Sequence, residues 1–411
     1  MEASVSVATA TPSRPRALLR RGGSFALQAS VLIGLLAASS APTPLYALYQ
    51  AEWHFSALTV TVVFSAYALA LLVALLAAGT LSDHLGRRPV LAGALLAEAA
   101  SMAIFATAHG VADLITARVV QGLATGAASG AAGAALLDFE HPHRPGRAAL
   151  ANSVTPVSGM AAGVLASTAL VQFAPAPTRT VYLILLLLFT AQAAAVALTP
   201  ETAHPHPGAW HSLRPSIAIA PSARRTMLLT APGVIAAWAL GGFYSSLGPS
   251  LARTIAPLTP RAVGGLVFFT LSLAAALAVL AARSLPASTA SIAGSALLVP
   301  GALLTLSSPY EHSLLALFAG TVLAGVGFGS VTQGALRRLL SGTQAAESAG
   351  TLAAYYVLSY LAMSIPAILA GVLTNRYGLT TAVSLYGATV ILLALAALAI
   401  PLLTRHHTAP R

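Results

Sequence analysis

The sequence predicts an all-α integral membrane protein with twelve transmembrane helices, arranged as two six-helix bundles. Three observations lead to this fold class. Hydrophobic residues make up 57% of the 411 residues, charged residues only 8%, and the mean hydropathy is +0.82. Apolar runs of membrane-spanning length recur along the chain, and the arginines fall unevenly on the two sides of the expected membrane. In a soluble domain about a quarter of the residues are charged, so a water-soluble globular protein is excluded.

The apolar runs define the spans. A helix needs about 20 apolar residues to cross a bilayer, and runs of about this length occur at residues 24–48, 57–81, 90–108, 111–137, 147–173, 180–199, 226–250, 261–282, 288–307, 312–336, 347–372 and 380–403. The stretch between the sixth and seventh runs is rich in Pro, His and Arg, which predicts a linker. The expected parts are a basic cytoplasmic arm at 1–23, an N-terminal half at 24–199, a cytoplasmic linker at 200–225, a C-terminal half at 226–403 and a cytoplasmic tail at 404–411.

An internal repeat supports the division into halves. The sequence of Ala162–Leu165 recurs as Ala370–Leu373, 208 residues later, and Gly126 and Gly334 share this offset. The residue types concerned are the commonest in the chain. The repeat therefore agrees with a duplicated six-span unit without proving it.

The placement of the arginines predicts the orientation. All 21 basic residues are Arg; with the N-terminus inside, sixteen lie on the cytoplasmic side, four lie outside and Arg118 lies within a span. Cytoplasmic loops are the ones that collect basic residues, so we expect a multi-pass protein of the cytoplasmic (plasma) membrane with both termini cytoplasmic. The arginines form no dense basic stripe of the kind that indicates a nucleic-acid partner. The absence of Cys and Lys excludes disulfides and a nucleotide-binding P-loop.

The loop between the second and third runs carries the most specific signal. It reads Gly79-Thr-Leu-Ser-Asp83-His-Leu-Gly86-Arg87-Arg88. Gly86 lets the backbone reverse between two helices, and a carboxylate at the C-terminal end of a helix needs compensation, which Arg87 and Arg88 or a facing helix N-terminus can supply. The loop resembles the signature of the major facilitator superfamily, and this resemblance implies a cytoplasmic gate that controls alternating access. The alternative is that the two arginines only anchor the topology.

The fourth run carries a second signature. Arg118 is followed by Gln121 and Gly122, which is similar to the Arg–Gln–Gly pattern associated with proton-coupled members of that superfamily. A charge within a span is costly and is typical of a functional site. Gly122, Gly126 and Gly130 lie four residues apart and predict a smooth face for close helix packing.

Glu98 is the carboxylate nearest the middle of a span. Burying it there costs about 2.5–3.5 kcal/mol on insertion scales. Counted from the hairpin turn, Glu98 and Arg118 differ in depth by about 4–5 Å, which an Arg side chain can bridge, so we expect a buried ion pair. A proton relay through Glu98 and a neutral acid facing lipid are the alternatives.

The fifth run is similar to the superfamily's antiporter signature only in part. Pro156 and Gly159 match, whereas Ala151, Thr155 and Met160 depart from it. The departures weaken the case for antiport over uptake. A proline bend with small-residue packing is an equal interpretation.

The resemblance implies that spans 1, 4, 7 and 10 line a central substrate cavity. The candidate lining side chains are aromatic, hydroxyl or amide: Ser39, Thr43, Tyr46, Gln121, Trp238, Phe243, Tyr244, Gln333 and Tyr356. Such a lining suits lipophilic or weakly polar compounds better than sugars or phosphates. For any one aromatic residue, core packing or an interfacial anchor is the alternative.

These features predict a secondary active transporter rather than an enzyme. We expect a proton-linked monomer, embedded in the lipid bilayer, that exports small and largely apolar compounds by alternating access, with no cofactor other than the proton gradient. The alternative within the same fold is an uptake porter or facilitator for a small metabolite; from other classes, a polytopic membrane enzyme or a non-transporting receptor. The acid and histidine cluster at 138–144 is expected to be a solvated charge cluster, not a metal site.

Overall fold

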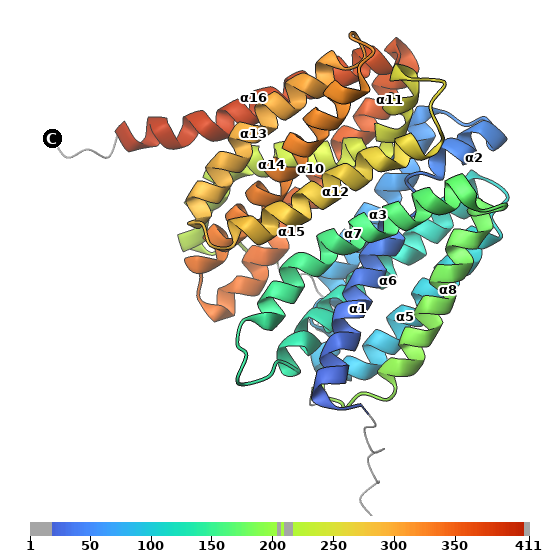
Figure 1. The fold of residues 1–411 in the computed structure, drawn as a ribbon. Coiled ribbons are helices and arrows are strands. Elements are labelled where there is room, and N and C mark those ends of the chain that lie inside the picture. The colour runs from blue at the N-terminus through green and yellow to red at the C-terminus, as the bar shows by residue number, and fades with distance from the viewer. Residues whose placement is uncertain (1–18, 204–206, 209–216, 407–411) are drawn as a thin grey trace, which may run out of the picture.

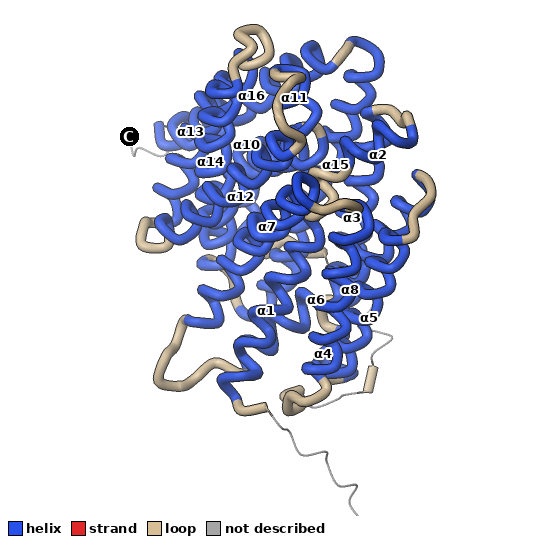
Figure 2. The backbone as a smooth tube through the Cα atoms, turned by 45° about the vertical axis from the view of Figure 1, so that its right-hand side comes forward, coloured by secondary structure: helices blue, strands red, loops and turns tan. Residues whose placement is uncertain are grey.

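The structure is a computed structural model that describes residues 19–203, 207–208 and 217–406. Most of the expected basic arm, part of the linker and the end of the tail lie outside these ranges. Within them the chain is helical and contains no strand, as Figure 2 shows. Twelve of the helices are long and apolar enough to cross a membrane. The predicted fold class is therefore confirmed.

The N-terminal half contains six of these helices. They are α1 (Arg21–Ser40), α3 (Ala57–Ala78), α5 (Arg87–Ala106), α6 (Val111–Asp138), α7 (Arg147–Phe173) and α8 (Pro177–Val196), with the short helices α2 (Tyr46–Trp53) and α4 (Leu81–Leu85) between them. The first apolar run was expected to be one helix, but it breaks after Ser40. Pro42 and Pro44 explain the break, because proline lacks a backbone N–H and disfavours a helical residue before it.

The C-terminal half repeats the arrangement. Its helices are α10 (Pro221–Ser246), α11 (Gly248–Ile255), α12 (Ala262–Ala282), α13 (Ala287–Ser307), α14 (Leu314–Ser341), α15 (Ala345–Tyr377) and α16 (Leu379–His406). All but α11 are long enough to span. Each half has its own apolar core of buried side chains. In Figure 1 the two bundles appear as a blue-to-green half and a yellow-to-red half.

Small residues bring the helix backbones together within each half. Gly122 and Gly126 of α6 face the backbone of α3, and Gly325 and Gly329 of α14 face the backbone of α12. A side chain at any of these positions would overlap its neighbour, as expected for close packing between membrane helices. The two pairs occupy corresponding places 203 residues apart. The halves are thus repeated in space. In spans 4 and 10, however, the structural offset differs from the offset of 208 seen in the sequence, because Gly334 faces α13 rather than the helix that corresponds to α3.

The bundle has two ends that differ in how the halves meet. We call the end with residues 79–88, 138–147 and 217–221 the linker end, and the end with residues 41–56, 107–110 and 247–261 the α2 end. Helix α7 packs on α12, and α3 packs on α15. Figure 1 shows the halves converging at α2 and α11 and diverging away from them.

Two glycines make the contacts that join the halves near the α2 end. Gly265 of α12 lies against Thr168 of α7 and Pro44, and Gly371 of α15 lies against Thr61 and Leu58 of α3. A side chain at either glycine would clash. The structure is therefore the conformation in which the α2 end is closed.

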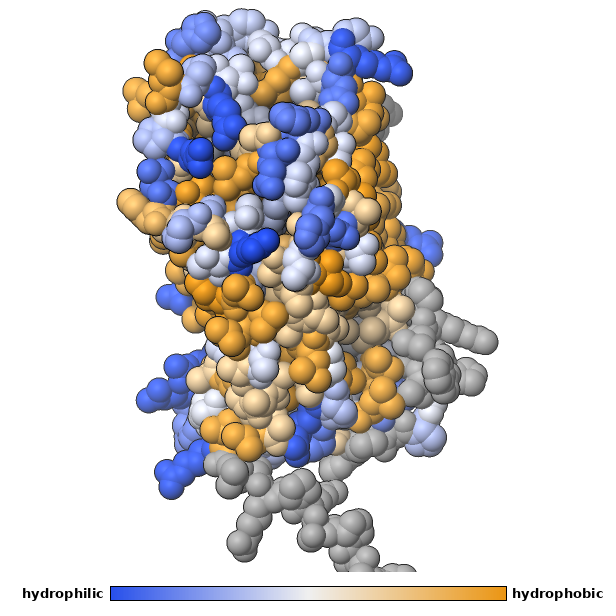
Figure 3. Space-filling view, turned by 90° about the vertical axis from the view of Figure 1, so that its right-hand side faces the viewer, coloured by the Kyte–Doolittle hydropathy of each residue, from blue (hydrophilic) through white to orange (hydrophobic). Residues whose placement is uncertain are grey.

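The surface has the pattern of a membrane protein. Figure 3, seen from the side on which α2 lies, shows hydrophilic side chains gathered on the upper part of that face, with hydrophobic surface beside and below them. Large exposed hydrophobic side chains occur on the outer faces of many helices, such as Val73, Leu187 and Leu392. These faces are suited to contact lipid.

A valine at position 371 tests the contact that closes the α2 end. Its side chain would collide with Thr61 and Leu58, and because carbon atoms in contact stay about 3.5–4.0 Å apart, α15 must retreat from α3 by about 1 Å or more. We expect Gly371→Val to lengthen the distance between spin labels on Glu52→Cys and Leu258→Cys. The chain has no natural Cys to interfere.

The matched control is Gly93→Val, because a side chain on Gly93 meets nothing within 4 Å. This variant should keep the parent distance. If Gly371→Val also keeps it while remaining folded, the glycine contact does not join the halves.

Candidate functional site

The predicted gate loop forms a short helix and a sharp turn at the linker end. Helix α4 begins directly after Thr80 and ends at Leu85, and Gly86 then has a φ of 101°. An L-residue rarely adopts this conformation. Gly86 therefore separates α4 from the start of α5 and places Arg87 and Arg88 in the first turn of α5.

The structure brings Asp83 and Arg87 together. Arg87 Nη1 forms a salt bridge with the carboxylate of Asp83, and it also donates to Ser82 Oγ over 2.6 Å. The Nε of the same guanidinium lies 3.5 Å from Oδ2 of Asp138, at the end of α6. Arg88 does not join this group, because its guanidinium donates to the backbone carbonyl of Ala197. One arginine thus connects the ends of α4, α5 and α6.

The start of the linker is fastened to the same loop. The carboxylate of Glu201 accepts hydrogen bonds from the backbone N–H groups of Arg87 (2.8 Å) and Arg88 (3.0 Å), and the hydroxyl of Thr202 donates to Asp138 over 2.6 Å. A carboxylate is favoured at the partially positive N-terminus of a helix. Sequence reasoning missed Glu201 and Asp138 as gate residues, since Glu201 lies 114 residues after Arg87 and Asp138 lies 51 residues after it.

In this conformation the described contacts of the gate loop lie within the N-terminal half and the start of the linker. These contacts do not join the two halves. The reason is geometric, because the halves converge at the opposite end of the bundle (Figure 1).

Arg118 is completely buried near the α2 end of α6. Its Nε and Nη2 donate to the hydroxyl of Tyr46 (3.1 and 2.7 Å), and its Nη1 donates to the carbonyl of Ser39 (3.0 Å) and to Oε1 of Gln121 (2.8 Å). The ring of Tyr67 lies 5.2 Å from the guanidinium carbon. Neutral oxygens and aromatic faces therefore hold this charge in place of a carboxylate.

The expected ion pair between Glu98 and Arg118 is not formed. Oε1 of Glu98 accepts a hydrogen bond from the hydroxyl of Thr125, and Oε2 has no hydrogen-bond partner among the described residues, although Glu98 is fully buried. Helices α5 and α6 pack so that Thr125, rather than Arg118, lies opposite Glu98. Because Glu98 is fully buried within the protein, the alternative of a neutral acid that faces lipid is also excluded.

One face of α6 nevertheless connects the two charged residues. Arg118, Gln121 and Thr125 follow the spacing that places side chains on one side of a helix, and all three are buried. Nε2 of Gln121 and the hydroxyl of Tyr67 have no hydrogen-bond partners in the described part of the chain. Polar groups with unused hydrogen-bonding capacity thus lie along this face, between Glu98 and Ser39.

A cluster of aromatic rings on the C-terminal half faces this region. The ring of Trp238 (α10) lies 5.7 Å from Phe328 (α14) and 5.2 Å from Tyr360 (α15), and Tyr356 lies 6.2 Å from Tyr360. The hydroxyl of Ser65 on α3 donates to the backbone carbonyl of Ser364 on α15 over 3.3 Å, so the part of α15 that carries Tyr360 lies against the N-terminal half. The rings therefore extend from the interior of the C-terminal half to the N-terminal half.

Two of the residues expected to line the cavity are placed elsewhere. Phe243 is buried against Tyr386 of α16, with ring centroids 5.1 Å apart, and the hydroxyl of Tyr244 is hydrogen-bonded to Thr305 of α13. Both side chains belong to the core of the C-terminal half. The reason is the rotation of α10, whose Gly242 packs on α15 at Met363.

The remaining predicted residues have mixed surroundings. Thr43 is buried, and Oε1 of Gln333 is buried without a hydrogen-bond partner among the described residues. The hydroxyl of Ser39 donates to its own helix, at Leu36, so its carbonyl rather than its side chain takes part in the site. Phe328 was missed because an aromatic residue in an apolar helix carries no signal of which side it faces.

The partial signature in α7 marks a close helix contact. Gly159 faces the backbone of α1 at Ile33, and Gly163 faces it at Ala37. Pro156 lies inside the helix one turn earlier. The structure therefore shows close packing at Gly159, and a role of this segment in antiport stays a prediction.

The comparisons with known proteins agree with this architecture. The Major Facilitator Superfamily matches residues 29–365, and no curated protein matches the chain. A substituted form of the nucleoside transporter NupG superposes with a TM-score of 0.72 at 12% identity, covering 91% of this chain and 99% of that one. The human organic anion transporter MFSD10 (TETRAN) gives a TM-score of 0.64 at 20% identity, with 91% and 99% covered.

At these identities the solved structures establish the shared fold alone. The family match shows more than the fold, because it spans most of the chain and includes the gate loop, Arg118 and the packed segment of α7. The chain belongs to the major facilitator superfamily of membrane transporters.

Proposed function

We propose that the protein exports small, largely apolar compounds across the plasma membrane in exchange for protons. The observation that carries this proposal is the aromatic cluster of Trp238, Phe328, Tyr356 and Tyr360, which reaches α15 where that helix lies against α3 of the other half. Ligand sites are lined mainly by aromatic and apolar side chains with a few polar groups. Here those polar groups would be Gln121, Gln333 and the indole N–H of Trp238, each with a buried atom lacking a hydrogen-bond partner in the described chain.

Proton exchange is supported by the surroundings of Glu98. An ionised carboxylate buried in an apolar region with one unpaired oxygen is costly, so the conformation described here favours neutral Glu98. In the other conformation, ionised Glu98 would be drawn toward Arg118, because Arg118 has no carboxylate partner among the described residues. Loss of the proton would then disturb the bonds of Arg118 to Tyr46 and Ser39, which tie α6 to the start of α2 and the end of α1.

The orientation follows from the arginines. Because basic residues favour the cytoplasmic side, we place the linker end and both termini in the cytoplasm. The closed α2 end then faces outward, and this conformation is the one open to the cytoplasm. Alternating access would require the halves, acting as a monomer, to rock apart at Gly265 and Gly371 and to close at the gate loop.

Uptake or facilitated diffusion of a small metabolite is the second candidate. The departures of α7 from the antiporter signature favour it, and the matching Gly159 is explained by packing on α1. The names of the structural neighbours, a nucleoside transporter and an organic anion transporter, keep small polar metabolites in the test panel.

Flux in proteoliposomes distinguishes the candidates. The purified chain is reconstituted, a pH gradient is imposed, and a panel of lipophilic dyes, nucleosides and organic anions is followed. We expect gradient-driven movement of dyes and none in protein-free liposomes. Movement of a nucleoside without dependence on the gradient would instead establish a metabolite facilitator and contradict proton-linked export.

The variant Glu98→Gln tests the proton site. The amide keeps the shape and the hydrogen bond with Thr125 but cannot exchange a proton. We expect gradient-driven flux to fall to the protein-free level while substrate exchange without a gradient persists. Glu52→Gln, at an exposed acid of the α2 end, serves as the control and should transport like the parent. Equal gradient-driven flux in Glu98→Gln and the parent would exclude Glu98 as the proton carrier.

The variant Asp83→Asn tests the gate. The Asp83 side chain is 49% exposed, and exposed ion pairs contribute about 0–1 kcal/mol to unfolding free energy, so the melting temperature should change little. Transport should nevertheless fall strongly, because the ends of α4 and α5 lose their connection.

Asp113→Asn is the matched control, since Asp113 accepts a hydrogen bond from the backbone of His109 at the other end of the bundle. It should leave transport unchanged. A parallel loss of stability and transport in Asp83→Asn would indicate a structural role and argue against a gate.

A further inference from the structure

A cavity of about 360 Å³ lies at the α2 end, where the two halves meet, away from the buried Arg118. One wall comes from the N-terminal half, at Pro44 and α2. The other comes from α11, the following loop and the start of α12, between Pro249 and Gly265. Its volume is within the range of about 300–1,000 Å³ that small-molecule sites occupy. No role has so far been given to it.

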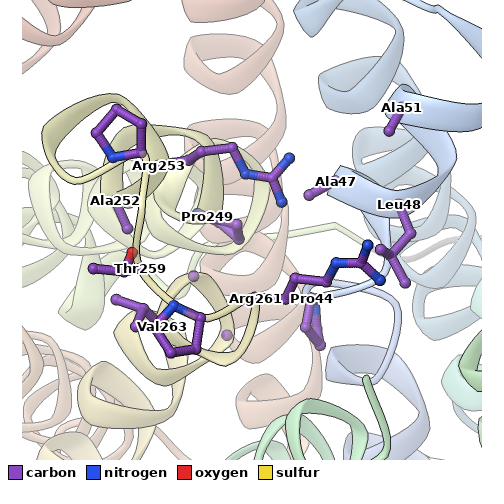
Figure 4. Close-up of a pocket in the computed structure, with 14 residues that line it drawn as sticks. Pro44, Ala47, Leu48, Ala51, Pro249, Ala252, Arg253, Thr259, Arg261 and Val263 are labelled. Carbon is purple, nitrogen blue, oxygen red and sulfur yellow. The ribbon is translucent and has the colours of Figure 1, made fainter. Parts of the chain in front are cut away.

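Two arginines of the C-terminal half line this pocket. Arg253 lies in the last turn of α11, and Arg261 directly precedes α12. Figure 4 shows both guanidinium groups pointing across the pocket toward α2. The two arginines lie on separate segments. The fold, rather than their spacing in the sequence, therefore brings their side chains together.

Neither guanidinium has an acidic or hydrogen-bonding partner among the described residues. None of the residues that line the pocket is acidic. The nearby Glu52 of α2 does not line the pocket and forms no ion pair with either arginine. Two uncompensated cations facing one concave site attract anions.

The wall opposite the arginines is apolar. It consists of the side chains Pro44, Ala47, Leu48 and Ala51. A bare inorganic anion would leave this wall unused, whereas an anion with an apolar body would bury it. The two arginines and the apolar wall together favour an anion that carries an apolar body.

We infer that this pocket binds a small amphipathic organic anion, a carboxylate or sulfonate on an apolar body. The head group lies between Arg253 and Arg261, where arginine's planar donors suit two-oxygen acceptors. The body lies against Ala47 and Leu48 of α2. Since both halves line the pocket, the ligand also bridges them and favours the conformation in which the α2 end is closed.

Calorimetric titration tests this site. Naphthalene-2-sulfonate is titrated into the full chain in phosphatidylcholine nanodiscs. We expect saturable binding that Arg253→Gln and Arg261→Gln each weaken about tenfold, the loss expected for one charge-assisted hydrogen bond. Arg253→Lys should recover part of the affinity, and raising the salt concentration should weaken binding, because the arginines are exposed.

The chain supplies matched controls. Arg179 and Arg376 are exposed arginines that do not line the pocket, so Arg179→Gln and Arg376→Gln should bind like the parent. The neutral naphthalene-2-sulfonamide should bind more weakly than the sulfonate. Undetectable binding to the parent, or equal binding to the parent and both pocket variants, would overturn the inference.

A further titrant separates the organic anion from a lipid headgroup. Glycerol phosphate carries the anionic head without an apolar body, and we expect it to bind at least about tenfold more weakly than the sulfonate, because it leaves the α2 wall uncovered. Leu48→Gln should weaken the sulfonate and leave glycerol phosphate unchanged. Equal affinity for the two titrants would reassign the pocket to lipid headgroups. The outcome is independent of the transport assays, because the titrations measure binding and neither Arg253 nor Arg261 belongs to the proposed proton site or gate loop.

Discussion

Every backbone N–H and C=O group within a bilayer must be satisfied by the chain itself, because lipid offers no hydrogen-bond partner. This constraint makes the protein helical from Arg21 onward in its described part. It also changes what holds the helices together. Lipid is as apolar as a leucine side chain, so association depends on close packing. Glycines such as Gly122 and Gly163, which let one helix backbone touch another, are therefore the residues on which the bundle depends.

The same constraint makes each buried polar group significant. Arg118 is buried at a cost, and the structure offsets it with the hydroxyl of Tyr46, two further oxygens and aromatic faces. Glu98 is buried with only one of its carboxylate oxygens bonded. A buried carboxyl group with one unbonded oxygen costs less free energy when it is neutral than when it is ionised. This difference is the basis of the proposed role of Glu98 in proton exchange.

The two ends of the bundle have different kinds of contact. The α2 end closes through glycines that fit against the partner half, and such contacts form or break as a whole. The linker end instead uses charges, with Arg87 joined to Asp83 and Asp138 and its backbone to Glu201. Because Glu201 begins the segment that leads to the C-terminal half, movement of that half can act directly on the gate loop. The start of the linker is thus part of the proposed gate.

The sequence by itself determined the spans, the predicted orientation, the family and the residues of the gate loop, because these depend on composition, length and local spacing. Gly86, Asp83 and Arg87 are close along the chain, so their meeting was predictable. Only the tertiary structure decided that Glu98 bonds Thr125 rather than Arg118, that Phe243 and Tyr244 pack within their own half, and that Glu201 reaches α5. The physical reason is that a helix apolar on all sides carries little signal of its rotation, and packing with its neighbours fixes which side chains meet.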